Sequence, residues 1–307
     1  MLGFTLRKIF LFLLILLYTP LAYSKDILIS FDGSGDLPVW RRTLDFAKKN
    51  KVKYTYFVSA PYFMMRSDLK EHPYWALKEI GQPPIKFRDG ELQEGHIKLR
   101  FNYLIRAIKE GHEIASHLCG HYDGSRWTYD QWIKEMEFFK LAMFLHFPPD
   151  IEGISGIVGI RAPNLAINNS YFLAAKHEGF LYDSSLVGQD TNNNLIKEIP
   201  IRRVKVGNVQ PTLENGWFVI RPKYIIPFDY EFNVAKKFLI GHNGAEQFFE
   251  SICLDYLNNA SPTQICLHFE NFGDDSPYLQ AMENFVLWAK DKNPNYMTYK
   301  EYMEKSY

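Results

Sequence analysis

Residues 27–50 read ILISFDGSGDLPVWRRTLDFAKKN and predict a strand followed directly by a helix. The apolar run Ile27–Phe31 has β character, and the apolar residues of Leu37–Asn50 recur at the spacing of an amphipathic helix. Asp32 begins the polar loop between the two elements. Strand-and-helix units of this kind build parallel sheets whose faces are covered by helices.

The same alternation predicts further units along the chain. Strands are expected at Tyr54–Val58, His112–Ser116, Ile157–Ile160, Gly179–Tyr182, Ile196–Pro200, Trp217–Arg221, Gln264–Phe269 and Tyr296–Tyr299. Helices are expected at Phe101–Lys109, Thr128–Phe147, Ser170–Glu178, Ala245–Leu257 and Tyr278–Lys290. The fold class is therefore α/β, a sheet or barrel of (β/α) units. Residues 61–95 interrupt the alternation with prolines and glycines and predict an irregular insertion over one end of the barrel.

Composition excludes two classes of protein. Of the 307 residues, 47% are hydrophobic and 16% aromatic, which excludes a chain that is mainly disordered. Lys and Arg number 35, as do Asp and Glu, so the net charge is zero and nucleic acid is not an expected partner. Three cysteines are too few for disulfides to be the main source of stability, and a pairing of Cys253 with Cys266 stays open.

Residues 1–24 have the three parts of a secretory signal peptide. Arg7 and Lys8 precede the uncharged apolar run Ile9–Tyr18, and a small-residue cleavage site ends at Ser24. The apolar run is shorter than the roughly 20 residues that span a bilayer. We therefore expect an exported protein, periplasmic or secreted, with one domain over residues 25–307. An uncleaved signal would be its only attachment to a membrane.

Polar side chains follow several of the predicted strands, at the points where the strands end. They are Asp32 and Asp36, His117 and His121, Arg161 and Asn164, Asp183, and His268. In parallel sheets and barrels, reactive groups collect beyond the carboxyl ends of the strands. The spacing of His117 and His121 lets both imidazoles reach one divalent ion, with surface or capping histidines as the alternative. Together these side chains are the set that metal-assisted hydrolysis requires.

Each of the other polar residues also has a structural alternative. Asp32 and Asp36 could cap the helix that follows them, and Asp36 is the better N-cap. Arg161 is either one half of a surface ion pair or the bidentate partner of a carboxylate. Asp183 could be a turn residue, and His268 could be a core histidine.

The order of these motifs resembles that of the polysaccharide deacetylase family, carbohydrate esterase family four. Residues 30–34, SFDGS, approach the family's Thr-Phe-Asp-Asp-Gly motif, and residues 117–121 approach His-Ser/Thr-x-x-His. Residues 161–164 resemble Arg-x-Pro-Tyr, Asp183 resembles the fourth motif, and residues 265–268 match the fifth, an apolar-x-Leu-His run. The resemblance covers the chain from about Ile27 to near Tyr302 and implies a distorted (β/α) barrel.

The resemblance also implies a role for each site residue. Asp32 would be the general base, and Arg161 would orient it. His268 would protonate the leaving amine, with Asp183 holding its imidazole in the charged form. The backbone N–H of Asn164 would help to stabilise the oxyanion.

One divalent metal ion, commonly zinc, is implied as the cofactor, held by an Asp together with His117 and His121. The second Asp of the family's first motif is replaced by Gly33, so the usual carboxylate ligand is absent from its place. Asp36 is the favoured substitute, because glycines allow the loop to fold back. Water in that position, or Asp32 acting as a ligand, are the alternatives.

The predicted function is metal-dependent hydrolysis of N-acetyl groups on an extracytoplasmic glycan, peptidoglycan or chitin-like. The N-acetylated cell-wall glycan is the expected partner, and a monomer is the expected state. Two alternatives stay open. One is a glycan-binding protein that has kept the barrel and lost catalysis, and the other is an O-acetyl esterase or amide hydrolase on the same barrel.

Overall fold

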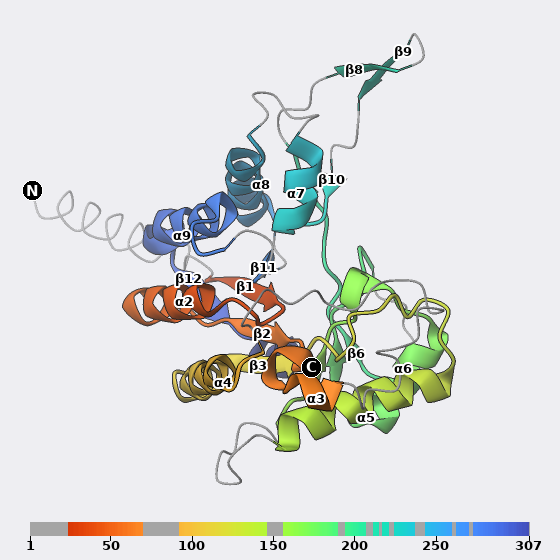
Figure 1. Ribbon diagram of the computed structural model, residues 1–307. Coiled ribbons are helices and arrows are strands. Elements are labelled where there is room, and N and C mark those ends of the chain that lie inside the picture. The colour runs from red at the N-terminus through yellow and green to blue at the C-terminus, as the bar shows by residue number, and fades with distance from the viewer. Residues whose placement is uncertain are drawn as a thin grey trace, which may run out of the picture.

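The computed structural model describes residues 24–69, 92–145, 156–189, 194–206, 211–214, 217–220, 224–236, 243–259, 262–269 and 273–306 (Figure 1). The predicted signal peptide, apart from Ser24, and residues 70–91 of the predicted insertion lie outside these ranges. No helix within the described ranges is long and apolar enough to cross a membrane. All three cysteines are buried free thiols, so Cys253 and Cys266 are not paired.

A parallel sheet forms the centre of the described chain. Its strands are β1 (Lys25–Asp32), β2 (Thr55–Val58), β3 (Glu113–Ser116), β4 (Gly159–Ile160), β5 (Tyr182–Asp183), β6 (Lys197–Glu198), β11 (Thr263–His268) and β12 (Pro294–Met297). The strand order is β11-β1-β2-β3-β4-β5-β6, β12 also pairs with β1, and these pairs are parallel. The sheet curls into a half-barrel with helices outside it, which confirms the predicted distorted (β/α) barrel.

Helices connect most of these strands, and most of the helices lie outside the sheet (Figure 1). They are α2 (Leu37–Asn50), α3 (Arg66–Leu69), α4 (Glu94–Lys109), α5 (Tyr129–Leu145), α6 (Asn169–His177), α7 (Asp229–Ala235), α8 (Gly244–Asn258), α9 (Pro277–Ala289) and α10 (Tyr299–Ser306). Helix α10 at the C-terminal end is the exception, because Tyr299 and Met303 pack inside the curl with Phe57 and Tyr182. Single 3-10 turns occur at η1 (Ala60–Phe63), η3 (Pro163–Leu165) and η6 (Lys290–Lys292). Helices α8 and α9 pack together at one end of the sheet, and α5 and α6 at the other.

Helix α2 has the bounds that the sequence predicts, and its caps explain them. The Asp36 carboxylate accepts a hydrogen bond from the Val39 N–H at 3.1 Å, and Lys51 ends the helix in the left-handed conformation. On the buried face, the Trp40 ring packs against the Tyr56 ring of β2 with 4.6 Å between centroids. Such aromatic pairs add about 0.5–1.5 kcal/mol beyond the area that they bury, so this contact anchors α2 on the sheet.

Several elements differ from the prediction. Helix α4 begins at Glu94, inside the predicted insertion. The strand predicted at Trp217–Arg221 exists as β9 (Trp217–Ile220), but it pairs antiparallel with β8 (Pro211–Glu214), away from the main sheet. A second antiparallel pair, β7 (Val204–Lys205) with β10 (Tyr224–Ile225), and helices α7 and α10 were not predicted. Elements this short hold too few residues to show a hydrophobic period.

The register of the sheet explains why the predicted site residues meet. Asp32 on β1 lies beside His268 on β11, and Ser116 on β3 lies beside Ile160 on β4. His117 and Arg161 therefore leave neighbouring strands at the same edge. This is the carboxyl edge of a parallel sheet, where ligand sites of α/β proteins are found.

Candidate active site

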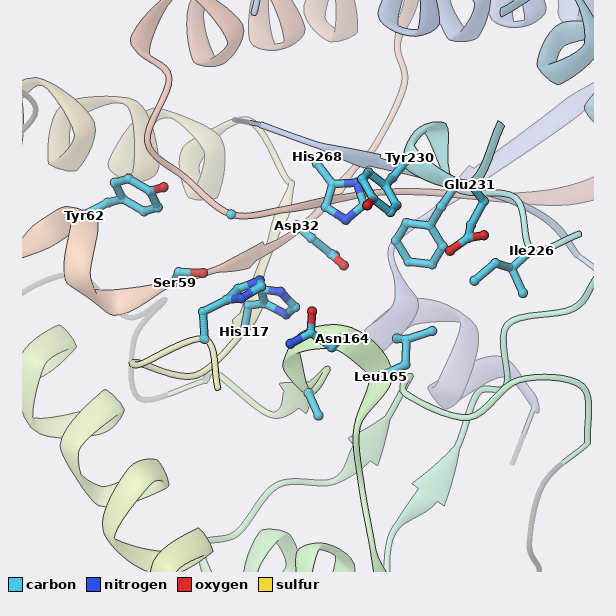
Figure 2. A pocket seen from close by; sticks show the side chains of 14 residues that line it. Asp32, Ser59, Tyr62, His117, Asn164, Leu165, Ile226, Tyr230, Glu231 and His268 are labelled. Atoms are coloured by element: carbon cyan, nitrogen blue, oxygen red, sulfur yellow. The ribbon is translucent and has the colours of Figure 1, made fainter. Parts of the chain in front are cut away.

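A cavity of about 510 Å³ opens at this edge of the sheet (Figure 2). Five of the predicted site residues line it: Asp32, His117, His121, Asn164 and His268. A cavity of this volume is in the usual range for small-molecule sites. The other three predicted residues, Arg161, Asp36 and Asp183, are not part of its lining, and each has a different position.

Arg161 lies fully buried beneath the cavity and forms an ion pair with Asp32. The distance from Arg161 Nη1 to Asp32 Oδ1 is 2.6 Å. The guanidinium also donates to the Ser30 and Ser184 hydroxyls, and its centre lies 4.0 Å from the Phe57 ring centroid. Because these contacts fix the guanidinium from several sides, it holds the Asp32 carboxylate in one orientation. The pairing uses one carboxylate oxygen and is not the bidentate contact that was predicted.

The ion pair determines the protonation state of Asp32. Burial alone would raise the pKa of this carboxyl, but the Arg161 charge and the nearby imidazoles of His117 and His268 outweigh it, so the pKa lies below its ordinary value. The second oxygen, Oδ2, accepts no hydrogen bond within the described part of the chain. Figure 2 shows the carboxylate directed into the cavity. Asp32 is therefore an ionised group with one oxygen available to a ligand.

His117 and His121 face the cavity as neutral imidazoles. The Nδ1–H of His117 donates to the Arg161 carbonyl oxygen at 2.9 Å, so its Nε2 carries the lone pair. The two ring centroids lie 5.3 Å apart. Burial lowers the pKa of both rings, that of His117 to about 3. Neutral imidazoles with free nitrogens are the form that binds metal ions.

The loop that carries the two imidazoles is held by Glu135 of helix α5. The buried Glu135 carboxylate accepts hydrogen bonds from the backbone N–H groups of Cys119 at 3.0 Å and Gly120 at 2.6 Å. Leu118 and His121 have φ values of 60° and 53°, which non-glycine residues rarely adopt. The carboxylate thus stabilises the strained turn that joins the two histidines.

Sequence reasoning missed Glu135, although a signal was present. Glu135 lies three residues after Trp132 and four before Phe139, on the buried face of the predicted helix. A charged residue on such a face must find a partner, because burying it alone is costly.

His268 is held by a carboxylate that the sequence did not indicate. Its Nδ1–H donates to Asp229 Oδ1 at 2.6 Å, and its backbone N–H donates to Asp229 Oδ2 at 3.0 Å. A parallel bridge between Phe228 and Cys266 brings Asp229 to the end of β11. This bridge leaves no local pattern in the sequence that could have predicted the pair.

Asp183 does not have its predicted role of holding the His268 imidazole. It accepts hydrogen bonds from the hydroxyls of Tyr171 and Ser185, both at 2.6 Å. The Ser185 hydroxyl in turn accepts the Ala162 N–H at 2.8 Å. The prediction was wrong because β5 lies five places from β11 in the strand order. Asp183 instead supports the loop that follows Arg161.

Asn164 has the position that its predicted role requires. It lines the cavity with φ 56°, a conformation that Asn tolerates better than most residues. Its backbone N–H lies in the first turn of η3, where the turn itself offers no acceptor. Within the described residues it has no hydrogen-bond acceptor, so it is available to a ligand.

The prediction that Asp36 is a metal ligand is not supported by the structure. Its carboxylate caps α2 through Val39, and it does not line the cavity. Gly33 has φ 88°, and its N–H donates to the Phe57 carbonyl at 3.0 Å, so the loop turns away after Asp32. The loop directs Asp36 into the helix cap, which is the structural alternative that the sequence offered.

The side chains of His117, His121 and Asp32 are of the types that bind a divalent metal ion, although they do not converge on one point. The described residues contain no group of three or more His, Cys, Asp and Glu side chains placed to hold an ion. His117 and His121 nevertheless supply two neutral imidazoles on one cavity wall, and the free oxygen of Asp32 faces the same space. Two imidazoles and a carboxylate are a common ligand set for zinc.

The half-barrel carries one carboxylate that a guanidinium fixes and one imidazole that a carboxylate fixes. These are the acid and base groups of a hydrolase.

Comparison with known proteins also indicates a hydrolase. The polysaccharide deacetylase family model matches residues 22–182. No curated protein sequence matches the chain. Since the family model covers more than half of the sequence, the chain belongs to the polysaccharide deacetylase family, hydrolases that act on carbon–nitrogen bonds other than peptide bonds.

Solved structures share the fold at low sequence identity. A Mycobacterium smegmatis protein assigned as a polysaccharide deacetylase is 14% identical, with a TM-score of 0.53 over 93% of this chain and 91% of that one. The Bc1960 peptidoglycan N-acetylglucosamine deacetylase is 13% identical, with a TM-score of 0.50 over 91% and 88%. The peptidoglycan deacetylase PdaC from Bacillus subtilis is 14% identical, with a TM-score of 0.48 over 93% of each chain. At these identities the first two support the fold alone.

Proposed function

We propose that the protein removes N-acetyl groups from an extracytoplasmic glycan of the peptidoglycan or chitin type. The observation that carries the proposal is that two side-chain pairs meet at one cavity, a carboxylate with a guanidinium and an imidazole with a carboxylate. Asp32 is paired with Arg161 at 2.6 Å, and His268 is paired with Asp229 at 2.6 Å. The first pair suits a group that accepts a proton, and the second suits a group that donates one.

In the first half of the reaction, Asp32 accepts a proton from the attacking water. The water oxygen forms a bond to the acetyl carbonyl carbon as the proton moves to the free Asp32 oxygen. Since the pKa of Asp32 lies below its ordinary value, the carboxylate is ionised at neutral pH and ready to accept. The Asn164 N–H, which has no acceptor within the described residues, donates to the negative oxygen that develops.

In the second half, His268 donates the proton on Nε2 to the amide nitrogen. The carbon–nitrogen bond breaks, acetic acid leaves and ionises to acetate in solvent, and the sugar keeps a free amine. Asp229 accepts from the Nδ1–H of the same ring, which fixes the ring's orientation and stabilises its positive charge before the transfer. The His268 side chain is 25% exposed, so its outer nitrogen can reach a substrate.

We further propose that the activity depends on a divalent metal ion, zinc by its ligand chemistry, held by His117 and His121. Such an ion supplies Lewis-acid chemistry at the acetyl carbonyl when it is bound. The Nδ1 contact of His117 to the Arg161 carbonyl supports this role, because it leaves Nε2 unprotonated. The extracytoplasmic location rests on the signal-like residues 1–24.

Acetate release tests the proposal directly. The purified chain would be incubated with N-acetyl chito-oligosaccharides and with peptidoglycan, with added zinc and separately with a chelator. We expect release that the chelator stops, and a loss of about 10²-fold or more for Asp32→Asn and for His268→Gln. Glu304→Gln, an exposed change on α10, serves as the control and should match the parent. No release from either glycan by the zinc-treated chain would contradict the proposal.

One observation favours a second function, glycan binding without hydrolysis. Gly33 stands where the family resemblance places a carboxylate, and the described residues hold no three-membered ligand group. In that case the chain would bind the oligosaccharides in calorimetry, release no acetate, and retain no zinc. Binding together with zinc retention but without release would point to the O-acetyl ester alternative, which an acetylated ester substrate then tests.

A further inference from the structure

One wall of the cavity is formed by the start of α7 and the residues before it, a segment with no role in the steps above beyond Asp229. We call this wall, made of Ile226, Phe228, Tyr230 and Glu231, the α7 wall. Figure 2 shows Tyr230, Glu231 and Ile226 on the side of the cavity next to His268. The bridge from Phe228 to Cys266 attaches the wall to β11, so its distance from the proton donor is fixed by the sheet.

The α7 wall presents aromatic surface beside the proton donor. The Phe228 ring centroid lies 5.3 Å from that of His268, and the Tyr230 centroid lies 6.3 Å from it. Tyr230 is 50% exposed, whereas Phe228 is buried. An exposed tyrosine combines an apolar ring with a polar hydroxyl, which suits the C–H faces and hydroxyls of a sugar. A sugar ring next to the reacting unit can therefore lie against Tyr230.

The same wall carries the carboxylate of Glu231, which no described residue contacts through a hydrogen bond or ion pair. Among the described residues that line the cavity, none is Lys or Arg. Arg161 is fully buried and paired with Asp32, so it cannot receive a carboxylate from a substrate. The α7 wall thus offers an acceptor for sugar hydroxyls or amines and repels anions.

We infer that the α7 wall is a sugar-binding subsite that selects amine-bearing or uncharged sugars and rejects carboxylate-bearing ones. The inference rests on the proposed function, because it concerns the sugar next to the one that is deacetylated. The preferred substrate class is then a chitin-like glycan, including one already partly deacetylated, over a glycan with muramic or uronic carboxylates. The free amines that the reaction produces would be bound by Glu231, so acetylated units beside earlier products remain good substrates.

Substrates of three charges test the subsite. The rates, as kcat/KM for acetate release, would be measured on a neutral N-acetyl chito-oligosaccharide, on its partly deacetylated form, and on a muramic-acid-containing oligosaccharide. We expect the parent to prefer the first two over the third. In Glu231→Gln the ratio of the amine-bearing to the anionic substrate should fall by about fivefold, the upper end for one solvent-exposed charge pair. In Glu231→Lys it should fall further, and added salt should reduce the parent's ratio.

Binding of a product-like ligand separates this inference from the proposed function. A fully deacetylated chito-oligosaccharide cannot release acetate, so its affinity, measured by calorimetry, reports on the subsite alone. Glu231→Gln and Tyr230→Ala should each weaken it, and the control Glu304→Gln should not. Unchanged affinity and unchanged substrate ratios in Glu231→Gln, or a parent that prefers the anionic glycan, would overturn the inference. Loss of acetate release from all substrates, with binding still dependent on Glu231, would count against the proposed function only.

Discussion

The imidazole of His268 and the carboxylate of Asp229 are in contact at 2.6 Å, although the two residues are 39 positions apart in the sequence. The same carboxylate accepts the backbone N–H of His268 through its other oxygen. It therefore determines both the orientation of the ring and which ring nitrogen faces the cavity. A proton donor in this arrangement depends on its partner for its charge as well as for its position.

Replacement of Asp229 by Asn should lower kcat by about 10²-fold or more, since the ring loses the charge that stabilises its protonated form. The effect would be measured as kcat for acetate release at one fixed pH. Asp183→Asn is the matched comparison, because Asp183 contacts Tyr171 and Ser185 instead of the imidazole. It should lower kcat by less than Asp229→Asn does. Equal losses in both variants would show that the Asp229 contact has no special role.

Replacement of Arg161 by Met should destabilise the fold strongly, because Asp32 would remain buried without its partner. The expected loss of unfolding free energy is about 3–5 kcal/mol, measured by urea denaturation. Adding Asp32→Asn to this variant should recover part of the loss by removing the unpaired charge. The control is Lys305→Met, which removes an exposed ion pair to Asp26 and should cost no more than about 1 kcal/mol.

Replacement of Glu135 by Ala should weaken zinc binding to the chain by about 10- to 100-fold, the range found when groups that orient metal ligands are removed. The loop between His117 and His121 would lose the acceptor for two N–H groups. Zinc affinity would be measured by competition with a chromophoric chelator. Glu137→Ala, on the exposed face of the same helix, should retain the parent's affinity. A similar loss in both variants would contradict this role for Glu135.

The buried carboxyl of Glu113 should make stability depend on pH. Burial raises its pKa from 4.5 to about 7, although Thr55 and Tyr182 donate hydrogen bonds to it. Since the folded state holds this proton more tightly, the contribution to stability is complete below pH 4.5 and is lost as the pH rises to about 7. The loss from this group is about 3 kcal/mol.

Comparison with Glu113→Gln isolates this effect from other titrating groups, such as His117, whose lowered pKa acts in the opposite direction. The free energy of unfolding of both proteins would be measured by urea denaturation at pH 5 and pH 8. The parent should lose more stability over this interval than the variant. Parallel changes would show that the Glu113 proton is not retained on folding.

Much of the site could be predicted because the relevant signals are local. An apolar run followed by a polar residue marks the end of a strand, and parallel strands bring their carboxyl ends together. This reasoning placed Asp32, His117, His121, Asn164 and His268 at one cavity, as the structure confirms. It also placed Arg161 near a carboxylate, which proved to be that of Asp32.

The errors concern partners rather than positions. Asp183 and Asp36 were assigned to the imidazole and the metal, but they hold a loop and cap a helix. The choice between a cap and a ligand for Asp36 depended on how the loop turns at Gly33. Several aspartates follow strands in this sequence, and any of them could hold the imidazole or cap a helix without a change in the local pattern. The spacing of the residues therefore could not show which aspartate has which role.

The amino-acid sequence alone determined the strands and helices that have a clear hydrophobic period, and it determined which reactive side chains follow the strands. It also offered the helix cap at Asp36 as the alternative to a metal ligand. The partners of those side chains came only from the folded chain. Asp229 reaches His268 through the isolated bridge between Phe228 and Cys266, and Glu135 reaches the histidine loop from helix α5. Contacts of this kind join residues far apart in sequence, and because one hydrogen bond or bridge has no periodicity, only the packing of the whole sheet and its helices brings them about.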